Sequence, residues 1–148
     1  MNKKPTKIIV DIIMTIFLIL SFVRWDGTGG AIYHIIVGSA CALFFSIHIC
    51  IHRKWIAATT KSCFAGKLKK AVQGKYIIDI ILLVVWGISI ITGFIALGPF
   101  FNEAADDFAW GRLHGITARV GLVLIIIHVI QHIPQIKSYL GIKKRVVS

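Results

Sequence analysis

The sequence predicts an all-α protein, a transmembrane four-helix bundle that runs up-down-up-down through a membrane. Three observations lead to this prediction. First, the 148 residues are 57% hydrophobic, whereas a typical soluble domain carries about 45–50% apolar residues. Second, the apolar residues gather in four long runs, and basic residues collect on alternate connections between them. Third, all 6 histidines lie in the second and fourth runs, in two copies of one pattern.

The four apolar runs are interpreted as membrane spans, because a hydrocarbon core of about 30 Å requires roughly 20 apolar residues. The runs are Ile8–Val23, Ala31–Ile51, Tyr76–Leu97 and Arg112–Ile133. The first is a little short for a crossing, and Pro134 is expected to end the fourth. Little sequence remains for a soluble domain, so we expect one four-helix membrane domain over residues 1–148.

The net charge of +11 is distributed as in a membrane protein, which argues against binding to nucleic acid. Of the 17 basic residues, 14 lie in the N-terminal leader, the second connection and the C-terminal tail. By the positive-inside rule these three segments are cytoplasmic, and four crossings return the chain to its starting side. We therefore expect a multi-pass protein of the cell (inner or plasma) membrane, with both termini cytoplasmic and its outer surface against lipid.

The second connection, residues 53–75, is expected to contain a helix of its own. Phe64, Leu68 and Val72 follow helical spacing among the basic residues of this connection. That pattern predicts an amphipathic helix lying on anionic lipid. Docking of a cytoplasmic electron donor is the alternative interpretation of the same basic segment.

The four runs are interpreted as two related helical hairpins. The segment KIIVDII at residues 7–13 resembles KYIIDII at residues 75–81, an offset of 68, while the histidine pattern repeats at an offset of 80. Asp11 and Asp79 each lie about one turn inside a span, where an ionisable residue is costly and usually has a partner. That partner is either the lysine four residues earlier or an imidazole, His52 or His132, which the carboxylate would orient.

In both histidine sets the first two members are 14 residues apart and the third follows 4 residues later. The sets are His34, His48 and His52, and His114, His128 and His132. Fourteen residues rise by about 21 Å and complete four turns of a supercoiled helix, so the first two imidazoles share a stripe at two depths. Because the second and fourth spans run parallel, the two sets face each other.

Facing imidazoles at two depths are what two bis-histidine haems require. We expect His34 to pair with His114 near the outer face and His48 to pair with His128 towards the cytoplasm. The haems would be non-covalent b-type groups, because no CxxCH motif is present. Arg119, five residues after His114 and inside the fourth span, is a candidate partner for haem propionates.

The third histidine of each set has three interpretations. His52 and His132 are alternative ligands of the inner haem, in place of His48 and His128. They are otherwise candidates for a quinone or proton site, or interfacial residues. We do not expect them to hold a third haem, because two irons about 6 Å apart cannot both hold stacked macrocycles.

A four-span bundle whose second and fourth helices carry H-x13-H resembles the core of the di-haem cytochrome b superfamily. The H-x3-H ending in His48-Ile-Cys-Ile-His52-Arg-Lys-Trp55-Ile resembles the small flavinylation-associated cytochromes, as does the lead-in Trp110-Gly-Arg112-Leu-His114. The fourth span departs from the pattern, because Ile-Pro-Gln follows His132 and no tryptophan does. The resemblance implies an electron-transfer component of an oxidoreductase system. Electrons would pass in either direction between a quinol or cytoplasmic donor and an extracytoplasmic, flavin-bearing partner.

Two alternatives to the cytochrome interpretation remain open. One is a haem-containing membrane anchor subunit of a larger dehydrogenase, which differs mainly in its partner and haem count. The other is a transporter or metal-ion carrier lined by histidines, because histidines and aspartates within spans also mark ion paths. A carrier favours helices broken near mid-membrane, whereas no proline interrupts any of the four runs.

Overall fold

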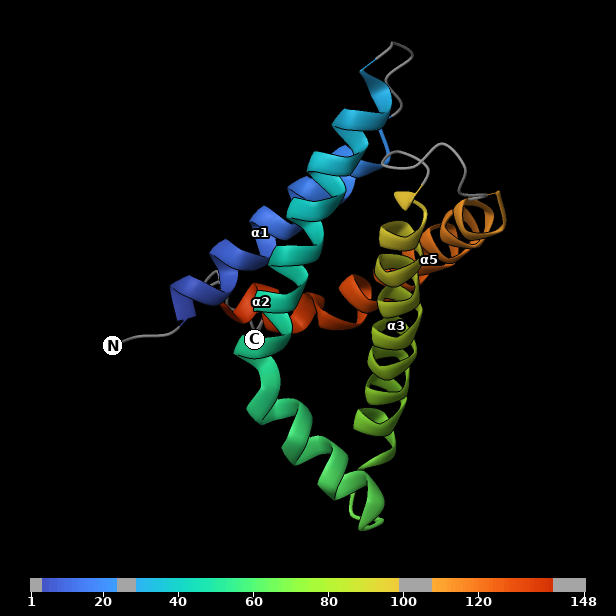
Figure 1. The fold of residues 1–148 in the computed structure, drawn as a ribbon. Coiled ribbons are helices and arrows are strands. Elements are labelled where there is room, and N and C mark those ends of the chain that lie inside the picture. The colour runs from blue at the N-terminus through green and yellow to red at the C-terminus, as the bar shows by residue number, and fades with distance from the viewer. Residues whose placement is uncertain (1–3, 24–28, 99–107, 140–148) are drawn as a thin grey trace. The chain divides into compact units, whose positions relative to one another are not determined.

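The computed structural model describes residues 4–23, 29–98 and 108–139, and within these ranges every regular element is a helix. The helices are α1 (Lys4–Ser21), α2 (Gly30–Phe64), α3 (Lys70–Ile95) and α5 (Phe108–Tyr139) (Figure 1). The predicted all-α class is therefore confirmed. The glycine-rich turn after the first run, the acidic third connection and the basic C-terminal tail lie outside the described residues.

The chain divides into two compact units, Met1–Ser62 and Cys63–Ser148. The first unit contains α1 with most of α2, and the second contains α3 and α5. Each unit is thus one of the two predicted helical hairpins. The assembly of both hairpins into a single four-helix bundle, with both termini on one side, stays a prediction.

Three of the four helices are long and apolar enough to span a membrane: Gly30–Phe64, Lys70–Ile95 and Ala109–Ser138. Large apolar side chains are exposed along them, among them Ile36, Ile91 and Val123. These surfaces indicate contact with membrane lipid. Helix α1 is 18 residues long and includes Lys4, Lys7 and Asp11, so its uncharged part is shorter than the roughly 20 residues of a typical span.

Helix α2 runs 13 residues beyond the predicted end of its span at Ile51. The segment 52–64 contains neither glycine nor proline, so nothing in it stops the helix. The helix ends before Gly66, which adopts a positive φ of 67° and donates its N–H to the Cys63 carbonyl at 3.0 Å. Only residues 65–69 remain as a connection, so the expected separate amphipathic helix is wrong. Its apolar positions are divided between the end of α2, the connection and the start of α3.

Helix α5 continues through Pro134 to Tyr139, so the expectation that this proline ends the fourth span is also wrong. A proline inside a helix removes one backbone N–H and crowds the carbonyl four residues earlier. Membrane helices tolerate this where a neighbouring group satisfies the loosened backbone. Pro134 leaves the Ile130 carbonyl without its helical partner, and Lys75 Nζ of α3 donates to the adjacent carbonyl, that of Gln131, at 2.9 Å.

At one pair of positions related by the internal repeat, the two hairpins bury side chains of different size. In the first unit Leu18 and Cys41 are buried. Their counterparts at offsets of 68 and 80 are Trp86 and Gly121. A Cβ atom added at Gly121 would lie 2.6 Å from Trp86 Cε3. The second hairpin therefore accommodates a tryptophan on one helix because the other helix has no side chain at that level.

Candidate metal centre

The first histidine of each set is held by a backbone carbonyl from the neighbouring helix of its own hairpin. His34 Nδ1 lies 3.1 Å from the Ser21 carbonyl oxygen, and His114 Nδ1 lies 2.8 Å from the Ser89 carbonyl oxygen. Ser21 and Ser89 differ by 68 positions, the same offset as Asp11 and Asp79. The internal repeat therefore extends from the sequence to the hydrogen bonds of the histidines.

Gly93 provides the space that the His114 ring occupies. A Cβ atom at position 93 would lie 3.0 Å from both His114 Cε1 and His114 Nδ1. Such a distance is shorter than ordinary van der Waals contact, so any side chain there would press on the ring. The glycine thus keeps the imidazole within hydrogen-bonding reach of Ser89.

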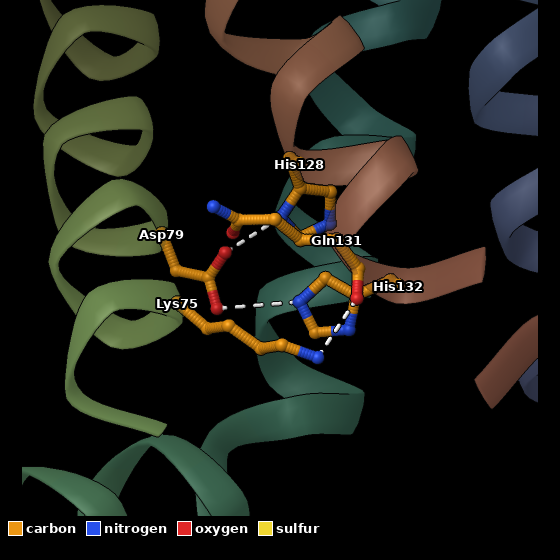
Figure 2. A network of polar contacts seen from close by, with 5 residues as sticks. All are labelled: Lys75, Asp79, His128, Gln131 and His132. Carbon is orange, nitrogen blue, oxygen red and sulfur yellow. Dashed lines mark hydrogen bonds and ion pairs between the residues drawn. The ribbon is translucent and has the colours of Figure 1, made fainter. Parts of the chain in front are cut away.

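The second histidine of each set is held by an aspartate instead. His48 Nδ1 lies 2.7 Å from Asp11 Oδ1, and His128 Nδ1 lies 2.6 Å from Asp79 Oδ1. The sequence suggested either the lysine four residues earlier or the third histidine as the partner of each carboxylate. The closest partner is instead the second histidine of the set. Lys75 bonds the Gln131 carbonyl (Figure 2), and among the described residues neither Lys7 nor Lys75 forms an ion pair with the aspartates.

The ring of the third histidine of each set lies next to that of the second, tilted by 35° in the first hairpin and 39° in the second. The ring centroids of His48 and His52 are 4.6 Å apart, and those of His128 and His132 are 4.5 Å apart. His132 Nε2 also lies 3.5 Å from Asp79 Oδ2 (Figure 2). That distance is too long for a good hydrogen bond, and this buried nitrogen has no hydrogen-bond partner in the described part of the chain.

These contacts create one cluster of possible metal ligands in each hairpin. The clusters are Asp11, His48 and His52, and Asp79, His128 and His132. In each, one ligand atom per residue lies within 4.8 Å of the others. Each hairpin can therefore hold a metal ion through oxygen and nitrogen donors, and the two clusters are related by the internal repeat.

In the first two histidines of each set, the Nδ1 contacts determine which ring nitrogen can bind a ligand. Carbonyl and ionised carboxylate oxygens only accept, so Nδ1 carries the proton in each contact and Nε2 is the atom with a lone pair. Nε2 lies on the far side of the ring from Nδ1, as Figure 2 shows for His128. Within the described residues, His48 Nε2 and His128 Nε2 have no hydrogen-bond partner.

The remaining predicted features have mixed outcomes. Arg119 is exposed on α5, and five residues separate it from His114, which places it about 140° further round the helix. Its contact with haem propionates stays a prediction. The pairing of His34 with His114 and of His48 with His128 joins the two units and also stays a prediction.

Sequence reasoning missed Ser21, Ser89 and Gly93. A signal for the two serines was present, because the offset of 68 relates them as it relates the aspartates. Gly93 had no such signal, because its importance lies in a contact between helices rather than in a motif. Comparison with protein-family models, with curated proteins and with solved structures finds no match for the chain.

Proposed function

We propose that the chain is a membrane di-haem b-type cytochrome, an electron-transfer component of an oxidoreductase system. It would carry electrons between a quinol or cytoplasmic donor and an extracytoplasmic, flavin-bearing partner. One observation above all supports this proposal. The four histidines of the H-x13-H pairs each present Nδ1 to an acceptor of the neighbouring helix, at 2.6–3.1 Å. Metal-bound histidines characteristically donate the other ring N–H to a carbonyl or a carboxylate in this way.

The donor set fits two haems. His34 with His114, and His48 with His128, would supply the axial imidazoles. Bound haem supplies reversible one-electron chemistry at iron. The chain's own contribution is to fix each imidazole by its Nδ1 contact and to surround it with apolar helices that exclude water. Two histidines holding each haem would leave the iron no free position for oxygen, so the residues present favour electron transfer over the binding of oxygen.

The contacts favour His48 and His128 over their neighbours as the inner ligands. His48 and His128 have their Nδ1 atoms held by carboxylates, so Nε2 is the ring nitrogen that each offers to a ligand. His132 instead directs Nε2 towards Asp79 Oδ2 at 3.5 Å. In this proposal His52 and His132 remain for a quinone or for proton exchange, and Arg119 for haem propionates.

A divalent-cation carrier is the second candidate, because each hairpin contains an Asp-His-His cluster. Its geometry favours it less. Two ligands of a tetrahedral zinc ion, each about 2.0–2.1 Å from the metal, lie about 3.3–3.4 Å from each other. The Asp11–His48 and Asp79–His128 contacts are 2.7 and 2.6 Å, which is the spacing of charge-assisted hydrogen bonds. These atoms would have to separate before both could bind one ion.

The experiment is purification in detergent from cells supplied with haem, followed by a reduced-minus-oxidised spectrum and a haem-to-protein ratio. We expect two b haems per chain. His34→Ala and His48→Ala should each lose one, whereas His52→Ala should keep both. Loss of one haem in His52→Ala instead of His48→Ala would mean that the inner haem is bound one helical turn closer to the cytoplasm. Protein without haem, but with stoichiometric zinc or another divalent ion by elemental analysis, would replace the cytochrome with the carrier.

A further inference from the structure

The two predicted haem levels differ in the charge of the groups that hold their histidines. At the outer level the acceptors are neutral carbonyls, at 3.1 Å from His34 Nδ1 and 2.8 Å from His114 Nδ1. At the inner level they are carboxylates, at 2.7 Å from His48 Nδ1 and 2.6 Å from His128 Nδ1. Both hairpins show this difference between a carbonyl and a carboxylate acceptor. The acceptor therefore depends on the predicted haem level and not on which hairpin supplies the histidine.

The charge of Asp79 is not cancelled by the nearest lysine. Lys75 lies one turn earlier on α3, yet its Nζ atom donates to the Gln131 carbonyl at 2.9 Å. Figure 2 shows the lysine passing below the carboxylate, with its contact on α5. Only 14% of the Asp79 side chain is exposed, against 45% for Asp11. The charge of Asp79 is therefore less screened by its surroundings, because Coulomb interactions strengthen in a low dielectric.

A carboxylate acceptor changes the ligand that it holds. A strong hydrogen bond from Nδ1–H to an anion gives the imidazole more electron density and makes Nε2 a better donor. Both this effect and the negative charge itself stabilise the more positive ferric iron over ferrous iron. Hydrogen bonding around the axial ligands is one of the means by which proteins set haem potentials.

We propose that Asp11 and Asp79 hold the inner haem at a lower reduction potential than the outer haem, so that electrons run outward from the cytoplasmic side. This inference rests on the proposed function. His48 and His128 would hold the haem that gives up one electron, from ferrous to ferric iron, and His34 and His114 would hold the haem that accepts it, from ferric to ferrous iron. No bond or proton changes, and the two aspartates act as positioning residues through His48 and His128.

The test is a spectroelectrochemical titration of the purified haem-loaded protein, its Asp79→Asn and Asp11→Asn variants and the charge-conserving Asp79→Glu. Asparagine keeps the shape and an acceptor oxygen but removes the charge. We expect two one-electron waves, with only the lower one rising in Asp79→Asn. The rise should be at least a tenfold change in the reduced-to-oxidised ratio, about 59 mV for one electron. Asp11→Asn should give a smaller rise, and Asp79→Glu should stay near the native potential.

The two waves are assigned with the single-haem variants, because His34→Ala should retain the inner haem and His48→Ala the outer one. The retained inner haem should titrate at the lower potential. An unmoved lower wave in both asparagine variants, or the opposite order of potentials, would overturn the inference while leaving the cytochrome intact. Loss of the inner haem from both asparagine variants would also overturn it, in favour of a purely structural role. Native protein without haem would instead refute the proposed function itself.

Discussion

Each candidate ligand depends on one acceptor atom, and the two carbonyl acceptors are available for different reasons. Ser21 is the last residue of α1, where helix carbonyls lack intrahelical partners. Ser89 lies inside α3, and its carbonyl also accepts a hydrogen bond from Thr92 Oγ1 at 3.1 Å. The His114 site therefore needs close approach between the two helices, whereas the His34 site uses a carbonyl that a helix end leaves unpaired. This difference makes Gly93 important in the second hairpin.

Replacing Gly93 with alanine tests that approach. The new Cβ atom would lie 3.0 Å from two atoms of the His114 ring, so the ring must shift and weaken its contact with Ser89. We expect Gly93→Ala to lower the haem-to-protein ratio towards one per chain, by loss of the outer haem. Gly87→Ala is the matched control on the same helix, because nothing lies within 4 Å of its added Cβ atom. That control should keep both haems and gain about 0.5–1 kcal/mol of stability from helix propensity. Equal haem contents in the two variants would contradict this role for Gly93.

Within the second hairpin, packing between helices relies on one large and one absent side chain. The large Trp86 side chain is only 8% exposed, because Gly121 on α5 has no side chain and leaves space for it. The first hairpin fills the same level with Leu18 and Cys41, both buried. The residue sizes in each pair are matched to each other. We therefore expect that exchanging one residue of a pair for its counterpart in the other hairpin will disturb the packing unless its partner is exchanged too.

A double-mutant cycle measures this dependence. Gly121→Ala would place a Cβ atom 2.6 Å from Trp86 Cε3, and overpacking of this kind costs about 1–3 kcal/mol. Trp86→Leu alone should also destabilise, because it leaves a cavity. Combined, the two changes should cost less than their sum, because the leucine makes room for the new methyl group. Gly115→Ala, which meets nothing within 4 Å, is the control. Strict additivity in the free energies of unfolding would show that the two positions are not coupled.

The end of α2 depends on the backbone conformation of Gly66. With φ at 67°, an alanine there adopts a left-handed conformation that costs about 1 kcal/mol. We expect Gly66→Ala to lower the free energy of unfolding by about that amount, measured by denaturant titration in detergent micelles. Gly74→Ala, inside α3 and free of contacts within 4 Å, should raise it instead. A Gly66→Ala variant as stable as the native protein would mean that the connection can end α2 without the left-handed turn.

For the molecule as a whole, the sequence predicted what depends on periodicity and missed what depends on contacts between helices. Hydropathy located the cores of all four helices, and the internal repeat related the histidines and aspartates of the two hairpins, because these features repeat along one chain. Helix ends were misjudged at Phe64 and Tyr139, since neither basic residues nor Pro134 stops a helix that its neighbours support. The aspartates were recognised as unusual, and His132 was among the partners considered for Asp79. Their shorter contacts with His48 and His128 were missed, because the rotation of one helix against its neighbour is not encoded in either segment alone.

The contacts of α1 bear on whether it crosses the membrane beside α2. His34 and His48 are 14 residues apart on α2, about 21 Å along its axis, and both are bound by α1, at Ser21 and at Asp11. If α2 spans the membrane, α1 must accompany it antiparallel through most of the same depth. The Asp11–His48 contact at 2.7 Å offsets the cost of placing a carboxylate there. These contacts favour a crossing by α1 in addition to the three helices that are long and apolar enough to span a membrane, and that fourth crossing stays a prediction.

If α1 also crosses, both termini are predicted to lie on the side of the α2–α3 connection, which contains basic residues and lies beside Cys63. The test uses protein in which Cys41 and Cys50 are replaced by alanine, so that Cys63 reports on that connection. Asn2→Cys and Ser148→Cys, each in a variant that also lacks Cys63, report on the termini. With a membrane-impermeant maleimide, all three positions should react only after the cytoplasmic side is opened. Reaction of the Asn2→Cys variant from the outside, with the other two still protected, would mean that α1 does not cross. The two hairpins would then differ in topology despite their shared histidine contacts.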